Sequence, residues 1–119
     1  MEKMIFTAEE NSFIVEAEGK KLKVSYAEFN GNHSDSMKFC EDNGGGDESV
    51  ENLRFLAKYR DTINKELDKL GKETLGGWYW TNELAWWNDY FAFVVSTDYG
   101  HVTNAHRYNP HHARAVSAL

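Results

Sequence analysis

Aromatic, asparagine and histidine side chains are concentrated in the last third of the 119-residue chain. All four tryptophans fall between Trp78 and Trp87, and four of the five histidines follow Tyr99. Trp and Tyr offer a large contact area at low entropic cost, while Asn and His offer adaptable hydrogen bonds. The lysines all precede this region, the last being Lys72. The chemistry that this composition favours is recognition of another molecule.

Two expected loops, over residues 81–89 and 104–112, and a turn over 98–100 carry most of these side chains. Consecutive side chains of an extended segment point opposite ways, so at least one of Trp86 and Trp87 should be exposed. The candidate ligand-binding residues are Asn82, Trp86, Trp87, Asn88, Tyr99, His101, Asn104, His106, Tyr108, Asn109 and His112.

A metal site is the first alternative for the histidines. The spacing of His101, His106, His111 and His112 fits no helical or zinc-knuckle motif, and the adjacent pair would point opposite ways in a strand. Cys40 is the single cysteine, which rules out an internal disulfide and a multi-cysteine metal site. We predict a fold that needs no metal and no cofactor.

Catalysis is the second alternative. Ser96, Asp98 and His101 lie close together in sequence, but no nucleophile elbow surrounds the serine. The glycines at 44–46 lack the Lys-Ser/Thr ending of a phosphate-binding loop, and Cys40 has no His or Asn in a motif context. A catalytic site needs several convergent groups, so we predict a binding protein and no enzyme.

Composition and length exclude further classes of function and bound the number of domains. A net charge of −6 argues against nucleic-acid binding, and no apolar run approaches the roughly 20 residues of a membrane span. The first ten residues contain no apolar signal core, so we expect a cytoplasmic or virion-associated protein. We expect one domain over 1–119, with scaffold elements in 1–75 and a C-terminal sheet with binding loops in 76–119. The oligomeric state is left open.

The elements that must position these residues follow from hydrophobic periodicity. Strands are expected at 13–17 and 22–26 around a turn at Gly19, and a turn is expected at 30–32 before a helix capped by Ser34 over 35–41. In the C-terminal part, strands are expected at 78–80, 90–95, 101–103 and 113–116, with Trp78 and Trp80 facing the core. The order of strands, helices and strands predicts an α+β fold with a mostly antiparallel sheet.

A longer helical region is expected between these strands. Its apolar stripe consists of Val50, Leu53, Leu56, Ile63, Leu67 and Leu70. Residues 60–62 could divide this region into two helices, and Gly71 stands where a glycine ends a helix.

Several short motifs resemble a C-type-lectin-like family of gut bacteria and their phages. They are Phe39-Cys40, the glycines at 44–46, the helix ending Ile63-Asn64-Lys65-Glu66-Leu67, Gly76-Gly77-Trp78-Tyr79-Trp80-Thr81-Asn82-Glu83, and the ending Arg114-Ala115-Val116. The resemblance covers about two-thirds of the chain. It departs from the family between Trp80 and Glu83, where two residues stand in place of the frequent three.

The resemblance implies a C-type-lectin-like fold in which the N- and C-terminal strands pair and the helices pack on the sheet. It also implies that the candidate binding residues project from one side. The variable target proteins of diversity-generating retroelements share this fold and this kind of ending, and adenine mutation of their Asn codons gives several of the residue types found at 82–112.

Trp87-Asn88-Asp89 matches a calcium-binding tripeptide of sugar-binding C-type lectins, but its proline-containing partner tripeptide is missing and the single proline is Pro110. We therefore expect no calcium site.

The function expected is recognition of a protein or glycan surface, as a retroelement-diversified or an adhesion protein. The alternative is a structural subunit whose aromatic loops are buried in an oligomer.

Overall fold

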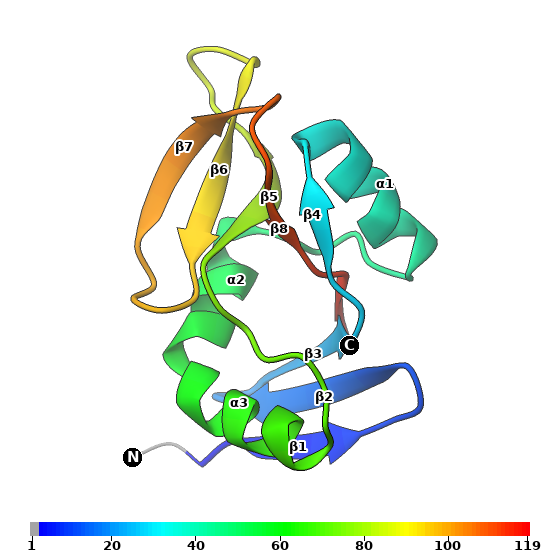
Figure 1. The fold of residues 1–119 in the computed structure, drawn as a ribbon. Helices are drawn as coiled ribbons and strands as arrows, with labels where there is room; N and C mark the ends of the chain where they lie inside the picture. Colours follow the sequence, from blue (N-terminus) through cyan, green and yellow to red (C-terminus); the bar gives the residue numbers. More distant parts are fainter. Residues whose placement is uncertain (1–2) are drawn as a thin grey trace.

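The computed structural model describes residues 3–119 as two β-sheets and three helices (Figure 1). The elements are β1 (Ile5–Ala8), β2 (Ser12–Ala17), β3 (Lys20–Ser25), β4 (Phe29–Gly31), α1 (His33–Asp42), α2 (Val50–Lys58), α3 (Arg60–Lys69), β5 (Trp78–Leu84), β6 (Phe91–Ser96), β7 (Val102–His106), β8 (His111–Ala113) and β9 (Val116–Ala118). The predicted α+β class is confirmed. No helix of the described residues is long and apolar enough to cross a membrane.

The lower sheet in Figure 1 has the strand order β1-β2-β3-β9. Its centre is the predicted hairpin, whose turn places Glu18 at φ 56° and Gly19 at φ 73°, the left-handed pair that a tight antiparallel turn requires. Antiparallel pairing of β9 with β3 confirms that the two ends of the chain meet in one sheet. Strand β1 was not predicted, because the residue types of Ile5–Ala8 show no clear alternation of apolar and polar positions.

The upper sheet has the order β4-β8-β5-β6-β7. Three of its strands run into segments expected to be loops: β5 extends to Leu84 past a bulge, β7 extends to His106, and β8 begins at His111. The expected last strand at 113–116 is wrong, because the chain leaves β8 at Ala113 and enters the lower sheet at Val116. The bounds of β8 and β9 are decided by backbone pairing, of β8 with β4 and of β9 with β3. Both partners are distant in sequence.

The first helix differs from the prediction at its start. Asn32, not Ser34, is the N-cap, and its side-chain oxygen accepts a hydrogen bond of 2.9 Å from the Asp35 N–H. The predicted turn before it is wrong, because Phe29–Gly31 pairs with β8 as β4. Side-chain capping two residues earlier than Ser34 allows the helix to begin at His33.

The long helical region is divided into α2 and α3 at Tyr59, whose backbone (φ −105°, ψ 14°) leaves helical geometry. This confirms a break next to 60–62. The end of α3 also follows the prediction. Gly71 has φ 68° and its N–H bonds to Asp68 O, while the Lys72 N–H bonds to Leu67 O.

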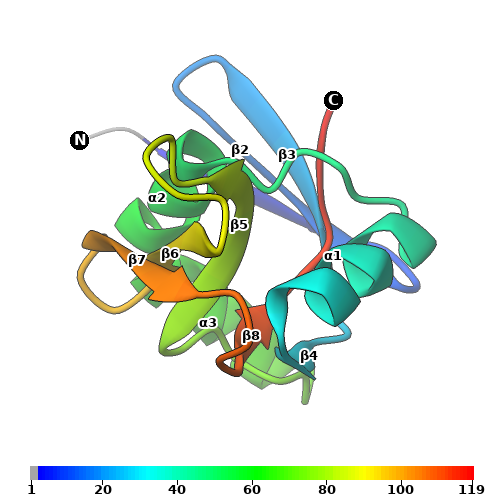
Figure 2. The same cartoon turned by 90° about the horizontal axis from the view of Figure 1, so that it is seen from above.

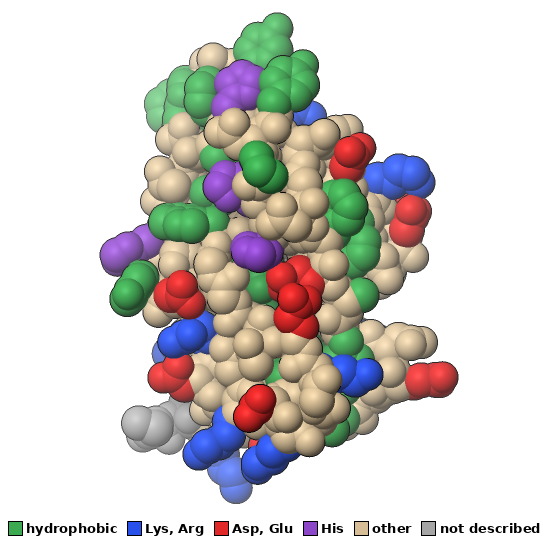
Figure 3. Space-filling model, in the orientation of Figure 1, with side chains coloured by type: hydrophobic (Ala, Val, Ile, Leu, Met, Phe, Trp, Pro, Cys, Tyr) green, Lys and Arg blue, Asp and Glu red, His purple; other side chains and the backbone are tan. Residues whose placement is uncertain are grey.

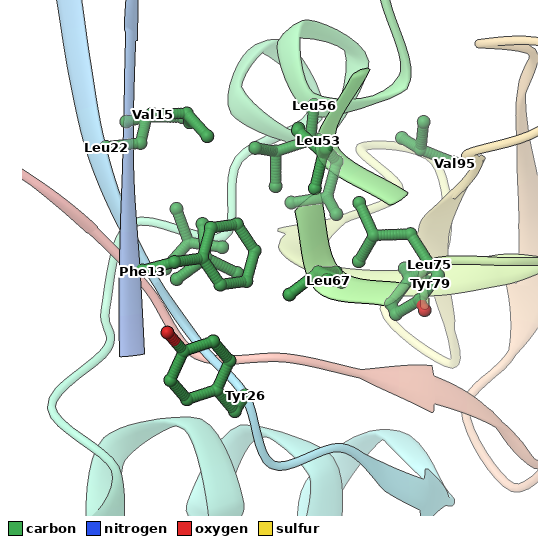
Figure 4. Close-up of a cluster of buried hydrophobic side chains, with 13 residues drawn as sticks. Phe13, Val15, Leu22, Tyr26, Leu53, Leu56, Leu67, Leu75, Tyr79 and Val95 are labelled. Carbon is green, nitrogen blue, oxygen red and sulfur yellow. The ribbon is translucent and has the colours of Figure 1, made fainter. Parts of the chain in front are cut away.

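The main core lies between the two sheets and the helices α2 and α3 (Figure 4). Four members of the predicted apolar stripe are buried there: Leu53, Leu56, Ile63 and Leu67. Val50 packs at the edge of this core, but Leu70 is 44% exposed and lies outside it. Burial of each large apolar side chain contributes about 1.5–3 kcal/mol, so this cluster is the main source of stability.

A second core fills the opposite face of the upper sheet. Trp80 is buried there with Ala92 and Val94, and Met37 of α1 packs against them. Trp78 packs on the same cluster but is only partly buried, so core placement is confirmed in full for Trp80 alone. Seen from above, α1 lies beside β4 and β8, while α2 lies next to β5 and β6 (Figure 2). Strands β5 and β6 therefore have a hydrophobic cluster packed on each face. This packing fixes the position of the loops at their ends.

Candidate functional site

Exposed aromatic side chains gather at the end of the molecule where β5 connects to β6 and β7 connects to β8. We call this surface the end patch and define it as Trp86, Trp87, Tyr90, His106 and Tyr108. Trp86 is 86% exposed and Tyr108 is 78% exposed. Figure 3 shows hydrophobic and histidine side chains together at the top of the molecule, whereas most charged side chains lie lower. Contiguous exposed apolar area is typical of interaction surfaces, so the end patch is the candidate site.

The β5–β6 connection carries the tryptophans on a loop held by its own backbone. The N–H of the buried Ala85 donates to Phe91 O at 2.8 Å, and the Asn88 side-chain oxygen accepts from the Tyr90 N–H at 3.0 Å. Trp86 and Trp87 meet edge to face with ring centres 5.0 Å apart, and Trp87 in turn meets Phe93 of β6. The expectation that at least one of these tryptophans is exposed is confirmed. Asn88 is exposed, but its oxygen shapes the loop.

The β7–β8 connection supplies the other half of the end patch. The His106 ring stacks on Tyr108 at 5.1 Å, with an interplanar angle of 27°, and lies nearly parallel to Tyr90 at 6.3 Å. His106 Nδ1 accepts from the Tyr108 N–H, and the Asn109 N–H donates to His106 O at 2.9 Å. His106 is therefore half-buried between two tyrosines, and Asn109 is exposed at the tip of the turn.

Arg107 joins the two connections. Its N–H donates to Tyr90 O at 2.9 Å, and its guanidinium donates to Asp89 O at 3.2 Å and to His33 Nδ1 at 3.3 Å. Because His33 Nδ1 accepts, its Nε2 carries the proton that is donated to Thr81 O at 2.8 Å. Burial lowers the pKa of His33, and the charge of Arg107 lowers it further, although the bond to Thr81 opposes this. A neutral, buried histidine thus anchors the arginine that ties the loops together.

Tyr99 and His101 do not join the end patch. They stack on each other at 5.7 Å on the turn between β6 and β7. The ladder pairs Phe91 with His106 at one end of this hairpin and Val95 with Val102 at the other, so the turn lies at the opposite end. His101 and His106 are five residues apart, or about 17 Å along a strand. The expectation that these residues project together with the others is wrong because an antiparallel hairpin separates its turn from its open end.

Three further candidates have other surroundings. Asn104 is exposed on β7 between the two aromatic groups. Asn82 is exposed too, but its side-chain N–H donates to Gly46 O at 3.0 Å and its backbone N–H to Glu48 O, which fixes the glycine loop. His112 faces inward: its Nδ1 lies 3.0 Å from Glu28 Oε2.

The placement of His112 corrects the expectation that it belongs to a binding loop. It lies in β8 next to a buried polar network centred on Glu28, which also accepts from Arg114 Nε at 2.9 Å and from the Tyr79 hydroxyl. Burial raises the pKa of Tyr79, so its phenol keeps the proton that it donates. His111, the neighbour of His112, meets Trp80 edge to face, and burial lowers its pKa. These two histidines therefore belong to the scaffold.

Tyr90, Phe91 and Arg107 line the site and were not among the predicted residues. Tyr90 was placed in the following strand, although it is 61% exposed and precedes the first ladder pair of β6. Its position after Asn88-Asp89, residues that favour turns, was the signal that it could belong to the loop. Nothing in the local sequence indicates that Arg107 bridges two connections, because its partners are distant in sequence.

The geometry gives little support to the catalytic and metal-binding alternatives considered from the sequence. Cys40 is buried, and burial raises its pKa to about 12, which keeps the thiol protonated. Asp98 is paired with Arg60 at 3.3 Å, and Ser96 is buried. Among residues 3–119 no group of three or more His, Cys, Asp or Glu lies close enough to hold a metal ion.

Comparison with known protein families, curated proteins and solved structures finds no match to this chain.

Proposed function

We propose that this chain is a non-enzymatic binding module that recognises a protein or glycan surface through the end patch. One observation carries the proposal: Trp86, Tyr90 and Tyr108 are more than half exposed, on two connections that backbone and arginine hydrogen bonds tie to each other. Rigid aromatic rings on a fixed scaffold lose little entropy on binding, so their burial converts efficiently into affinity.

The fold supports a C-type-lectin-like assignment for this module. The pairing of β9 with β3 brings the ends of the chain together, and the C-terminal sheet carries the exposed connections. We extend the proposal to a variable or adhesion protein of the retroelement-diversified kind. Exposure of Asn104 and Asn109 supports it, because surface positions tolerate replacement. Sequencing the flanking DNA tests this extension: a reverse transcriptase gene and a near-copy of the 3′ end are expected, and their absence contradicts it.

The binding proposal is tested by applying labelled protein to a printed array of glycans and bacterial surface proteins. Wild type should bind a restricted set of spots. The double variant Trp86→Ala/Tyr108→Ala should lose these signals, because both rings are exposed and their removal leaves the cores intact. Lys65→Ala, an exposed position on α3, is the matched control and should bind as wild type does. Equal binding by the double variant would refute the role of the end patch.

The alternative is a structural subunit in which a sister chain covers the end patch. The 86% exposure of Trp86 beside a second tryptophan favours it, since monomers rarely leave such apolar area open. Tryptophan emission and solution mass separate the two functions. An obligate oligomer with blue-shifted emission that returns to the red in Trp86→Ala/Tyr108→Ala would support burial and contradict recognition of a foreign partner.

A further inference from the structure

The outer edge of β7 differs from the edges formed by β9 and β1, because it has neither charged residues nor carboxylates that block strand pairing. The outer edge of β9 is closed, because Val116 and Ala118 donate their N–H groups to the carboxylates of Glu48 and Asp47. Strand β1 lies between Lys3 and Glu9, and charges of this kind protect an edge. From Gly100 to His106 the chain contains no Lys, Arg, Asp, Glu or Pro, and within residues 3–119 no strand pairs with the outer side of β7.

The backbone groups that β7 turns outward follow from its pairing with β6. His101 O accepts from the Ser96 N–H, and the Arg107 N–H donates to Tyr90 O. Residues that bond to a neighbouring strand alternate with residues that face away, so Val102, Asn104 and His106 direct their N–H and C=O groups outward. The His106 carbonyl already accepts from the Asn109 N–H, while its N–H remains available at the edge.

We propose that a second copy of the chain pairs with this edge, β7 to β7 and antiparallel, about a two-fold axis at Asn104. In this register each outward residue meets an outward residue: Val102 faces His106 of the second copy, and the two Asn104 amides face each other. No two lysines and no two carboxylates are brought together, and amide pairs hydrogen-bond well because each has donors and an acceptor. The edge is therefore self-complementary, which favours a second copy over an unrelated strand.

This pairing unites the two aromatic groups that one chain keeps at opposite ends of the hairpin. In the same register Val102 lies opposite His106 of the second copy, so the turn that carries the Tyr99–His101 stack lies at the end of the interface nearest to the partner's end patch. Each of the two equivalent surfaces then contains Trp86, Trp87, His106 and Tyr108 from one chain and Tyr99 and His101 from the other. This use of the dimer rests on the proposed binding function, whereas the dimer itself does not.

Sedimentation velocity without ligand tests the dimer. Asn104→Pro removes one outward N–H and leaves the bonds to β6, and edge strands tolerate proline. Asn104→Ala keeps the N–H and is the matched control. Wild type and Asn104→Ala should sediment as dimers and Asn104→Pro as a monomer with an unchanged far-ultraviolet circular dichroism spectrum. A wild-type monomer at all concentrations overturns the proposal, as does a dimer that Asn104→Pro leaves intact.

Cysteine cross-linking tests the register independently of the proline variant. The two Asn104 Cα atoms would lie about 5.5 Å apart, within the range of a disulfide. Asn104→Cys should therefore form a covalent dimer on mild oxidation, and Thr103→Cys, which lies off the axis, should not. The native Cys40 is buried and does not compete. Equal cross-linking of both variants would overturn the register.

The shared surface is tested on the array of glycans and surface proteins. Tyr99→Ala should weaken the spots that wild type binds and should add nothing to the loss caused by Asn104→Pro. An equal effect of Tyr99→Ala in both backgrounds would overturn the shared surface. Binding of wild type by a monomer would overturn the dimer and leave the proposed function standing, so the two failures are distinguishable.

Discussion

Arg114 and Glu28 form a buried ion pair, with Arg114 Nε 2.9 Å from Glu28 Oε1, between the segment that leaves β8 and the segment that follows β3. The same guanidinium donates to the carbonyls of Glu73 and Thr74, which fixes the segment that enters β5. One arginine therefore joins the two sheets to the connection after α3. Side-chain exposures of 1% for Arg114 and 8% for Glu28 place both charges out of water.

Arg114→Met should lower the free energy of unfolding by about 3–5 kcal/mol, because it leaves the Glu28 carboxylate buried without its cation. Glu28→Gln/Arg114→Met should recover part of this loss, since the double variant no longer buries a carboxylate. Equilibrium denaturation in urea measures both variants. A loss below about 1 kcal/mol for Arg114→Met would mean that water reaches the carboxylate and that the pair is not a structural anchor.

Stability should fall as the pH is lowered from about 7 toward 5. The pKa of His33 and that of His111 are both lowered in the folded chain, in each case mainly by burial. The unfolded chain then binds more protons below its ordinary histidine pKa of about 6.5, so the free energy of unfolding decreases as the pH falls through that value toward the folded pKa.

The thermal midpoint measured across this pH range checks the expectation. His33→Gln retains a side-chain amide for the Thr81 carbonyl but cannot titrate, so its midpoint should depend less steeply on pH. His101→Gln alters an exposed ring and serves as the control. An unchanged slope in His33→Gln would show that other groups cause the acid sensitivity.

Substitutions on the exposed connections should be tolerated. Asn104→Ala and Asn109→Ala should each change the free energy of unfolding by no more than about 0.5 kcal/mol, as surface sites do. His106 is stacked between Tyr90 and Tyr108, so we expect a larger loss for His106→Ala.

The buried comparison for this series is Leu56→Ala. Leu56 is 1% exposed, so this variant should cost about 2–5 kcal/mol. Urea denaturation of the four variants gives the comparison. If Asn104→Ala or Asn109→Ala costs as much as Leu56→Ala, these side chains support the fold and are not free for binding.

The thermal midpoint should not change when EDTA is added. The chain has one cysteine, and in the described residues no cluster of three metal-ligating side chains exists, so the cores must supply the stability. Differential scanning calorimetry with calcium, with EDTA and with neither tests this. A clear drop with EDTA that calcium reverses would point to a site that includes Asp89, the carboxylate nearest to the exposed tryptophans in sequence.

Local patterns were sufficient to predict the β2–β3 hairpin, the break between α2 and α3 and the end of α3 at Gly71. Each depends on neighbours in sequence: a left-handed turn, an interrupted stripe or a glycine that ends a helix. Strand β4 was missed because Asn30-Gly31 is typical of a turn, and only its pairing with β8, more than 80 residues away, makes it a strand.

The residues of the candidate site also fall into two groups: those that local sequence predicts and those whose position depends on distant contacts. The exposure of Trp86 and Tyr108 follows from residue type and loop position, and both were predicted. His112 was misplaced because its direction is decided by Glu28, which is distant in the sequence. Tyr99 and His101 were placed in the same surface as His106 without a strand register, which the structure supplies.

The central claim is that the end patch binds a partner, and a dissociation constant tests it most directly. The strongest spot of the array, prepared as a purified ligand, is titrated into wild type, Trp86→Ala and Lys65→Ala by isothermal calorimetry. Removal of a central aromatic anchor typically costs about 2 kcal/mol or more, so Trp86→Ala should weaken binding by roughly 30-fold while Lys65→Ala binds as wild type does. Equal dissociation constants for Trp86→Ala and wild type, with both proteins folded, would contradict the claim.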